Sequence, residues 1–428
     1  MTMYSPNPAL REPLTLSAFL PLFLSYYAQA VLAILPNTFI FKLFLLPFIL
    51  WQGWKCAVGF DFAIRVAQWF GHENTGTLTF WNYLFVVRFP QKWESPQGQL
   101  LKPSVQDAIL KIALKSFEWT FTKRPLRKYE SSKHGERQDT DTPTERHPPI
   151  STALADALDL LNNQRGLGWS WSRDPFPCRS TPPPSIALLL AQALLKLTMF
   201  DASQYIVQRI FPSVSDPRGG SIFDPSLALA PRVALAAFCS VCGGWWAYAM
   251  LDSGYYVSAL FGRIIFRQPA SESPPPLFHQ PWMSTSLQDF WNFRWHQLLR
   301  PLFISFGARP GGALLGRPGA VMGAFTVSAI THHIPMWGIG NGTEFITVGG
   351  FFLLMGVGVI IEIAFTRATG WRVRGWVGWV WAMTWSTLWG TLIMDAWTRH
   401  GLLANVFFPN GFRPGKKVVD TIIALANR

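Results

Sequence analysis

The chain contains seven long runs of apolar residues, and these runs limit the folds that it can adopt. Because the hydrocarbon core of a bilayer is about 30 Å thick, an α-helix needs about 20 apolar residues to cross it. The runs therefore predict an all-α fold, a multi-pass transmembrane helical bundle of about seven to nine spans, with a shorter stretch at 78–87 as a re-entrant segment. The seven runs are 14–35, 39–60, 186–200, 233–260, 321–339, 345–365 and 376–395.

The balance of charged residues agrees with a membrane protein. Charged side chains make up 14% of the 428 residues, against about 25% in typical soluble domains. The net charge of +13, from 37 Lys and Arg against 24 Asp and Glu, suits a basic cytosolic face and an anionic ligand. We expect no nucleic-acid partner, because the basic residues are scattered between apolar runs without a zinc-ligand spacing or a recognition-helix pattern.

The chain has four cysteines, which are too few for a disulfide framework. Cys239 and Cys242 form a CxxC pattern, but they lie inside the run 233–260. This position favours small buried residues of a membrane helix over a redox site. The first apolar run is long enough to span a bilayer and a second follows closely, so we expect a signal anchor at the N-terminus.

The runs divide the chain into three parts. They are N-terminal transmembrane helices at 1–87, a polar insertion at 88–183 and a C-terminal transmembrane core at 184–428. Within the insertion, residues 124–149 are rich in charge, Thr and Pro and have almost no large apolar residue, which predicts a disordered loop. The basic residues of the insertion, Lys111 and Lys115 among them, indicate a cytosolic position.

The segment 284–300, STSLQDFWNFRWHQLLR, predicts a strongly amphipathic helix. Ser286 followed three residues later by Asp289 is a capping-box-like start, and Pro301 marks the expected end. With successive residues about 100° apart around a helix, the polar side chains gather on one face. That face carries Asp289, Asn292, His296 and Arg300. Such a helix fits the membrane surface, and its polar face can also close over a buried site.

The run 321–339, VMGAFTVSAITHHIPMWGI, has His332 and His333 as its only ionisable residues. Ionisable groups inside a membrane segment are costly and by default mark functional sites, although a lone histidine on an apolar face is often a core residue. Ser328 lies one turn before His332 and is expected beside it. The two histidines point about 100° apart and no spaced carboxylates accompany them, so we expect no metal. A neutral histidine is a suitable general base, and no GxSxG elbow indicates a serine acyl-enzyme.

Three segments carry longer patterns. They are SLQDFWNFRWHQ at 286–297, FTVSAITHH at 325–333 and NQRGLGWSW at 163–171. They resemble the S-L-x-x-F-W-x-x-R-W-[HN], S-[GA]-x-x-H and R-G-x-G-W-x-W segments of the wax-synthase-like branch of the membrane-bound O-acyltransferases, especially fungal members that acetylate terpenoid alcohols. Order and spacing agree over most of the chain outside the 124–149 loop. His333 stands where relatives often carry Asp or Glu, and Asn292 and Phe293 stand where plant relatives show Gly and Arg.

The resemblance implies an MBOAT-like fold and transfer of an acyl group from coenzyme A to an alcohol inside a membrane-enclosed tunnel. His332 would deprotonate the acceptor hydroxyl, and His296 with Asn292 would orient groups or stabilise the oxyanion. The cofactor-binding residues expected from the same signature are Arg294, Trp295 and Arg300. Arg294 equally fits a snorkelling interfacial arginine.

The resemblance favours transfer of acetyl from acetyl-CoA to a hydroxyl of a terpenoid or meroterpenoid secondary metabolite. The expected partners are a hydrophobic alcohol, acyl-CoA and the lipid bilayer, and the expected location is the endoplasmic reticulum. A wax ester synthase that acts on long-chain alcohols is the nearest alternative. A transporter that uses His332 as a proton relay is the alternative from another class, although no internal repeat supports it. The acceptor, the acyl chain length, the role of His333 and the oligomeric state stay open.

Two further features are expected at the membrane boundary. Trp169 and Trp171 fit anchors of a loop at the interface better than substrate contacts. Asn341 begins an N-glycosylation sequon, and its use would place that loop in the lumen.

Overall fold

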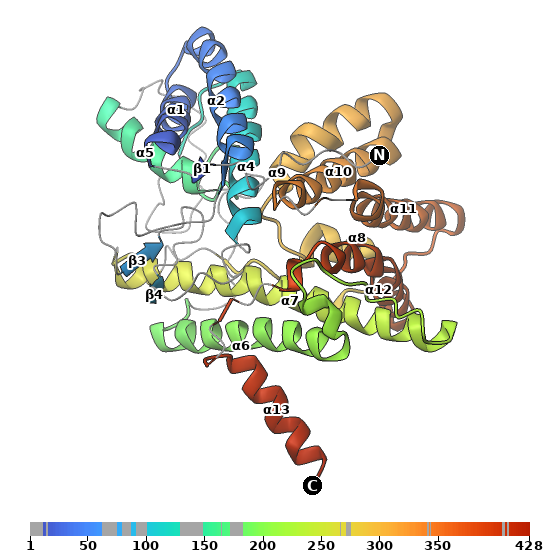
Figure 1. The fold of residues 1–428 in the computed structure, drawn as a ribbon. Helices are drawn as coiled ribbons and strands as arrows, with labels where there is room; N and C mark the ends of the chain where they lie inside the picture. The colour runs from blue at the N-terminus through green and yellow to red at the C-terminus, as the bar shows by residue number, and fades with distance from the viewer. Residues whose placement is uncertain are drawn as a thin grey trace.

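The structure is a computed structural model, which describes most of the chain. The described residues are 12–13, 16–61, 75–78, 87–90, 101–128, 149–163, 165–171, 183–265, 267–270, 275–339, 342, 344–404, 407–408 and 411–428. Residues 79–86 of the predicted re-entrant segment, residues 129–148 of the predicted disordered loop and Asn341 lie outside this set. The described part is overwhelmingly helical (Figure 1), which confirms the predicted all-α class.

The long helices form at the predicted apolar runs. They are α1 (Leu16–Ile34), α2 (Phe39–Gly59), α6 (Ile186–Ile210), α7 (Leu229–Ile264), α10 (Arg309–Ile339), α11 (Phe345–Thr369) and α12 (Gly375–Arg399). Within the described residues, six stretches are long and apolar enough to cross a membrane: α1, α2, α6, α7, α11 and Arg300–Ile334. α12 occupies the seventh predicted run. The prediction of a multi-pass helical membrane bundle is therefore confirmed.

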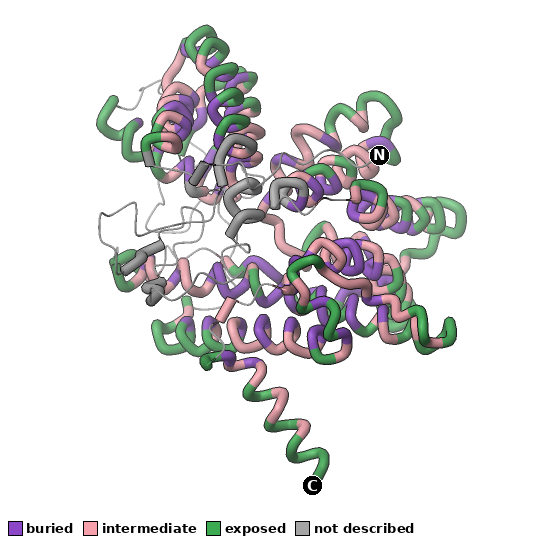
Figure 2. The backbone as a smooth tube through the Cα atoms, in the orientation of Figure 1, coloured by how far each residue is buried: buried purple, intermediate pink, exposed green. Residues whose placement is uncertain are grey.

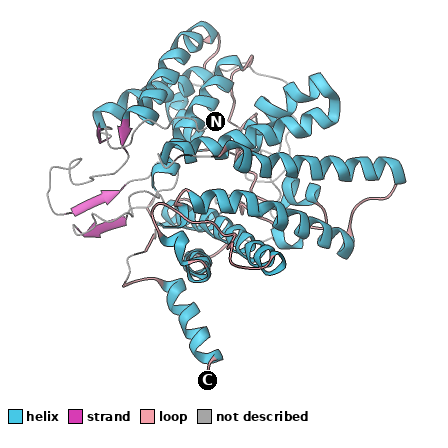
Figure 3. Ribbon diagram, turned by 45° about the vertical axis from the view of Figure 1, so that its right-hand side comes forward, coloured by secondary structure: helices cyan, strands magenta, loops and turns pink. Residues whose placement is uncertain are grey.

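The remaining elements are short or lie outside the apolar runs. The other helices are α4 (Leu101–Phe121), α5 (Ile150–Asn162), α8 (Leu287–Asp289), α9 (Arg300–Phe303) and α13 (Pro414–Ala426). β1 (Glu12–Pro13) pairs in parallel with β2 (Phe60–Asp61), and β3 (Thr75–Leu78) pairs antiparallel with β4 (Val87–Pro90). The β3–β4 pair lies at one side of the molecule (Figures 1 and 3), and helices dominate the rest of the described residues.

One group of helices combines α1 and α2 with α4 and α5 of the predicted insertion (Figure 1). Tyr26 of α1 stacks on Trp119 of α4 with ring centroids 5.1 Å apart. α4 also packs against α10. Lys111 and Lys115 of α4 are buried, so these two basic residues of the insertion belong to a packed helix. They lie four residues apart on the inward face of a packed helix.

The second group joins α6 to α7, α7 to α12, α12 to α11 and α11 to α10. Many side chains on the outer surface of the helices are apolar and exposed, for example Leu194 at 57% and Ile346 at 88% (Figure 2). A membrane helix presents such side chains to lipid tails, which are as apolar as the protein interior. Cys239 and Cys242 are buried within α7, as predicted.

A tight hairpin precedes the second half of α10. Leu315 and Gly316 depart from helical geometry, and Gly316 has a φ of 63°, which reverses the chain. The returning arm packs so closely on the preceding π-helix, η7 (Ile304–Ala308), that a Cβ on Gly323 would collide with the carbonyl oxygen of Gly307. Small residues thus hold the His332 arm against its neighbour through backbone contact.

The predicted helix over 284–300 is wrong in its second half. α8 continues into a π-helix, η6 (Phe290–Arg294), and the chain turns away at Trp295, whose N–H donates to the carbonyl five residues earlier at 2.8 Å. The side chain of Gln297 donates to the Trp295 carbonyl at 2.7 Å, a bond to the backbone that a continuing helix would not need. Pro301 opens α9 and does not end the earlier helix.

Candidate active site

His332 lies in the last third of α10 and is partly buried. Its Nδ1 lies 2.8 Å from the carbonyl oxygen of Ser328, one turn earlier, as the spacing predicts. A carbonyl oxygen can only accept a hydrogen bond, so Nδ1 of the neutral ring bears the proton and Nε2 carries the lone pair. The ring centroid lies 4.3 Å from that of Phe352 of α11. The helix therefore fixes the tautomer that a general base needs.

His333 faces different neighbours. Its side chain is buried, with an exposure of 8%, and its ring meets Phe345 edge-on at 5.1 Å. Phe345 begins α11, whereas Phe352 beside His332 lies two turns further along. In the described residues no three His, Cys, Asp or Glu side chains are arranged to hold a metal. The geometry distinguishes the two histidines, since His332 lies beside Phe352 with its Nδ1 bonded to the Ser328 carbonyl, whereas His333 lies beside Phe345.

Two carboxylates bind the start of the signature segment, which is residues 286–297. Ser286 accepts a hydrogen bond from the N–H of Asp289, whose carboxylate in turn accepts from the N–H of Thr285, so the predicted capping box forms. Glu362 of α11 is almost fully buried, with an exposure of 1%. It accepts from the N–H groups of Leu287 and Gln288 at 2.6 and 3.0 Å and from the indole N–H of Trp381 at 2.9 Å. An anionic carboxylate thereby satisfies the free N–H groups of a helix start.

Glu362 was not among the residues expected from the sequence. Glu362 lies 75 positions after Leu287 in the sequence. No local sequence pattern can therefore indicate that the two residues are in contact. The single signal was an acidic residue inside an apolar run, which is costly in a membrane and therefore needs partners.

Arg294 ends η6 and pairs within the protein. Its Nε donates to the Asp289 carboxylate at 2.7 Å, and Nη1 donates to the carbonyl of His279 at 3.2 Å. The carbonyl of Arg294 accepts from the N–H of His279 at 3.0 Å. Arg294 thus fastens the signature segment to the loop that precedes it. Arg300 lies partly buried at the first position of α9.

Trp295 and Asn292 lie on different sides of the break. Trp295 stacks on Phe290 at 5.2 Å and meets Phe278 edge-on at 5.1 Å, so its ring is part of the packed interior. Asn292 is exposed. Because the helix ends before His296, the predicted polar face that joined Asn292 to His296 and Arg300 does not form.

His296 follows directly after the break at Trp295 and is partly buried. Its Nδ1 is sealed from solvent and has no hydrogen-bond partner among the residues that the structure describes. Burial, together with smaller contributions from His332 and Lys111, lowers the pKa of His296 to about 3. The ring meets Phe278 edge-on at 5.8 Å. A neutral histidine with an unsatisfied buried nitrogen is therefore close enough to His332 to interact with it electrostatically.

Lys111 reaches this site from α4. It is 9% exposed, and its charge acts on His296. One turn along, the ammonium of Lys115 lies 3.9 Å from the Trp171 ring centroid and 2.9 Å from Glu118, which accepts from Ser305 of η7. Polar side chains of α4, which belongs to the predicted insertion, thus act on His296 and bond to η7.

The described residues of the segment 163–171 build a turn. Asn163 bonds both the N–H and the carbonyl of Leu167, and Gly166 has a φ of 72° with no room for a Cβ beside the Trp171 ring. Trp169 is fully buried and its indole N–H donates to Asp159 at 2.8 Å. Its predicted place as an interfacial anchor is wrong, because the ring packs into the core of α1, α4 and α5.

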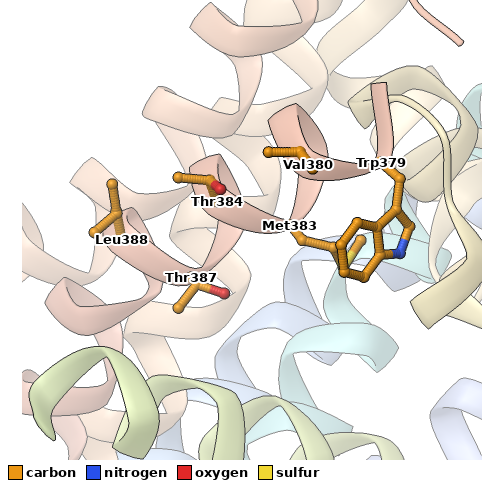
Figure 4. A pocket seen from close by; sticks show the side chains of 6 residues that line it. All are labelled: Trp379, Val380, Met383, Thr384, Thr387 and Leu388. Carbon is orange, nitrogen blue, oxygen red and sulfur yellow. The ribbon is translucent and has the colours of Figure 1, made fainter. Parts of the chain in front are cut away.

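A surface hollow on α12 lies apart from these residues. Its lining is Trp379, Val380, Met383, Thr384, Thr387 and Leu388 (Figure 4). None of these side chains can act as an acid or a base near neutral pH. The hollow therefore offers no catalytic group of its own.

Part of the chain matches a known family. Residues 274–354 match the family model described as membrane bound O-acyl transferase family. This stretch contains α8, η6, His296 and His332, together with the Glu362-bound start of the segment at Leu287 and Gln288.

The chain is also similar to several curated proteins. It is 32% identical over 107 residues to the long-chain-alcohol O-fatty-acyltransferase of Simmondsia chinensis, covering 23% of this chain and 30% of that protein. It is 24% identical over 241 residues to the O-mevalon transferase yanI of Aspergillus niger, covering 50% and 53%. It is 30% identical over 106 residues to acyl-CoA--sterol O-acyltransferase 1 of Arabidopsis thaliana, covering 23% and 31%. The chain thus spans between about a third and about half of the length of these relatives.

Proposed function

We propose that this protein is a membrane-bound O-acyltransferase, which transfers an acyl group from acyl-CoA to the hydroxyl of a hydrophobic alcohol. The observation that carries the proposal is the pair of histidines. His332 presents an Nε2 lone pair because the Ser328 carbonyl fixes its tautomer, and His296 stays neutral beside it with a sealed, unsatisfied Nδ1. The family match over 274–354 includes both residues.

In this mechanism Nε2 of His332 takes the proton of the acceptor hydroxyl while the alcohol oxygen attacks the thioester carbonyl. The tetrahedral intermediate collapses with cleavage of the carbon–sulfur bond, and the thiolate of coenzyme A takes the proton from His332. The products are the ester and free coenzyme A. The serine side chains need not form a covalent intermediate in this scheme.

His296 serves as a hydrogen-bonding group in the same scheme. A neutral imidazole has one N–H donor and one acceptor nitrogen. The donor can meet the oxygen that becomes negative in the transition state, where one well-placed donor contributes roughly 10²- to 10³-fold to the rate. Loss of solvent around the ring strengthens such a contact.

For the substrates, we propose acetyl-CoA as donor and a terpenoid or meroterpenoid alcohol as acceptor. The similarity to the fungal O-mevalon transferase, which extends over 50% of this chain, supports this choice. A long-chain alcohol is the second candidate, because the Simmondsia protein reaches 32% identity, although over 23% of this chain.

The finer site assignments belong to the same proposal. Asn292 would contact the substrate from the exposed side of η6, and Arg294, Trp295 and Arg300 would bind coenzyme A. For Arg294 this role adds to its pairing with Asp289. We also propose an endoplasmic reticulum location and the division into parts at 1–87, 88–183 and 184–428.

The test is an ester-forming assay with membranes that contain the full-length protein. Labelled acetyl-CoA and a long-chain acyl-CoA are each combined with terpenoid alcohols and with long-chain alcohols, and membranes without the protein serve as the control. We expect an ester with acetyl-CoA and a terpenoid alcohol. An ester formed with long-chain alcohols alone would replace the substrate proposal, and no ester with any pair would contradict the proposed function and favour the transporter.

A further inference from the structure

Helix α13 is amphipathic, and part of its apolar face stays exposed in the part of the chain that the structure describes. The apolar face consists of Val418, Val419, Ile422, Ile423, Leu425 and Ala426. Three of these side chains, Val418, Ile422 and Leu425, are 46%, 60% and 62% exposed. They follow an i, i+4, i+7 spacing and so form one stripe along the helix. Figures 1 and 3 show α13 extending away from the rest of the bundle.

The opposite face of α13 is polar and basic. Within the helix it carries Lys416, Lys417, Asp420 and Thr421, and Asn427 and Arg428 follow directly after the last helical residue. The boundary between this face and the apolar one is sharp over the length of the helix, apart from Ala424 on the polar side. Helices of this kind lie in the boundary between lipid headgroups and acyl chains, with basic residues toward phosphate groups.

The first turn of α13 is fixed to α6. The guanidinium of Arg413 donates to the Asp201 carboxylate at 2.8 Å, with side-chain exposures of 8% and 1%, and the N–H of Lys416 donates to the same carboxylate at 3.1 Å. Gly415 packs so closely on the α6 backbone that a Cβ would collide with the N of Ala202. The position from which α13 departs is therefore rigidly defined.

That position lies where the apolar part of α6 ends. The run 186–200 is apolar, and from Asp201 onward α6 carries Ser203, Gln204, Gln208 and Arg209. Gln204 and Gln208 donate to the carbonyl of Leu403, just beyond α12. Polar groups from the ends of two membrane helices thus meet beside the root of α13, as they do where helices leave the hydrocarbon.

The polar face of α13 also bonds to this end of α6. Tyr205 donates its hydroxyl proton to Asp420 at 2.7 Å, and Lys416 pairs with Asp420 at 2.6 Å. Tyrosine is enriched at the level of the headgroups. These contacts hold the helix with one side toward α6 and leave the stripe of Val418, Ile422 and Leu425 facing outward.

We propose that α13 lies in the headgroup region of the membrane that α6 spans, with the Val418, Ile422 and Leu425 stripe in contact with lipid and with Lys417 and Arg428 toward lipid phosphates. This surface would bind the bilayer of the protein's own membrane. The inference rests on the membrane-spanning fold and holds whether or not the protein is an acyltransferase.

The experiment places a polarity-sensitive NBD fluorophore on the full-length protein in vesicles of phosphatidylcholine and phosphatidylserine. Labels are attached in Ile422→Cys and Leu425→Cys on the apolar face and in Ala424→Cys, an exposed position on the polar side, as the matched control. Cys178→Ser supplies the background, because the three described native cysteines are buried. Two quenchers are compared, a nitroxide on the lipid near the headgroup and iodide in the water.

We expect the labels of Ile422→Cys and Leu425→Cys to emit at shorter wavelength, to lose emission to the nitroxide lipid and to be protected from iodide. The label of Ala424→Cys is expected to show the opposite preference. Equal access of iodide to all three labels would overturn the proposal. Protection from iodide without quenching by nitroxide lipid, together with crosslinking between two copies through Ile422→Cys, would also overturn it and assign the stripe to a dimer contact.

Discussion

At the scale of single residues, His332 is oriented by a hydrogen bond that its own helix supplies. The Ser328 carbonyl holds Nδ1 at 2.8 Å and so leaves the lone pair on Nε2. In many catalytic histidines a carboxylate has this task. Here His333 stands at the next position and no carboxylate is needed, because a backbone carbonyl also accepts from Nδ1–H. The nearest acidic residue that the signature segment uses, Glu362, holds the segment and not the histidine.

The neutral state of His296 makes the stability of the protein depend on pH. The ordinary pKa of histidine is 6.5 and burial lowers that of His296 to about 3. Between these values the unfolded chain binds a proton that the folded chain does not, so the free energy of unfolding decreases as the pH falls. We expect His296→Gln to lose less thermal stability than the wild type between about pH 7 and about pH 5. The measurement is thermal unfolding of the detergent-purified protein.

An equal decrease for both proteins over that range would mean that His296 is not a buried neutral group. The comparison of each protein with itself at neutral pH removes any stability difference that the substitution causes by packing alone.

At the scale of elements, the signature segment is a short helix held at both ends. Glu362 and the capping box fix its start, and Arg294 fixes its end to the preceding loop. The π-helical turn and the bond from Gln297 then direct His296 inward. π-helical turns within α-helices often occur at functional sites.

Removal of the Glu362 carboxylate is expected to destabilise this segment. Glu362→Ala would leave two backbone N–H groups and the Trp381 indole without their acceptor in a buried position. Each buried donor that loses its acceptor lowers the free energy of unfolding by about 1–3 kcal/mol. We expect a lower unfolding temperature and a larger loss of activity than in Ile361→Ala, which removes a side chain exposed on the same helix. Equal effects of the two substitutions would contradict the assigned role.

The glycine contact in the α10 hairpin offers a second test of an element. In Gly323→Ala the new Cβ would collide with the Gly307 carbonyl, whereas a Cβ at Gly350 of α11 meets nothing within 4 Å. We expect Gly323→Ala to lower both the unfolding temperature and the rate of ester formation, because the arm that carries His332 must move. Gly350→Ala serves as the matched control, and a similar loss in both variants would show that the close packing is not required.

At the scale of the whole molecule, the positions of the membrane helices could be predicted because hydropathy is a local property of the chain. The predicted run 39–60 became α2 (Phe39–Gly59), and the run 345–365 became the first part of α11. The ends of the helices could be predicted less well. α6 continues ten residues beyond Phe200, and this part of the helix makes polar contacts to Arg413 and Leu403.

The arrangement of the site depended on contacts between distant segments and could be predicted only in part. Ser328 beside His332 followed from helical spacing. The break before His296 did not, because it depends on the bonds of Trp295 and Gln297 in the folded chain. The place of Lys111 in the site could not be predicted, because it depends on the packing of α4 against α10, two helices far apart in the sequence.

The most direct test of the central claim compares the rates of ester formation by His332→Gln and His333→Gln in the same membranes. If His332 is the general base, His332→Gln should lower kcat by roughly 10²- to 10⁴-fold with little change in the unfolding temperature. His333→Gln should retain a rate close to that of the wild type. A His332→Gln enzyme that keeps the wild-type rate, or an equal loss in both variants, would contradict the assignment.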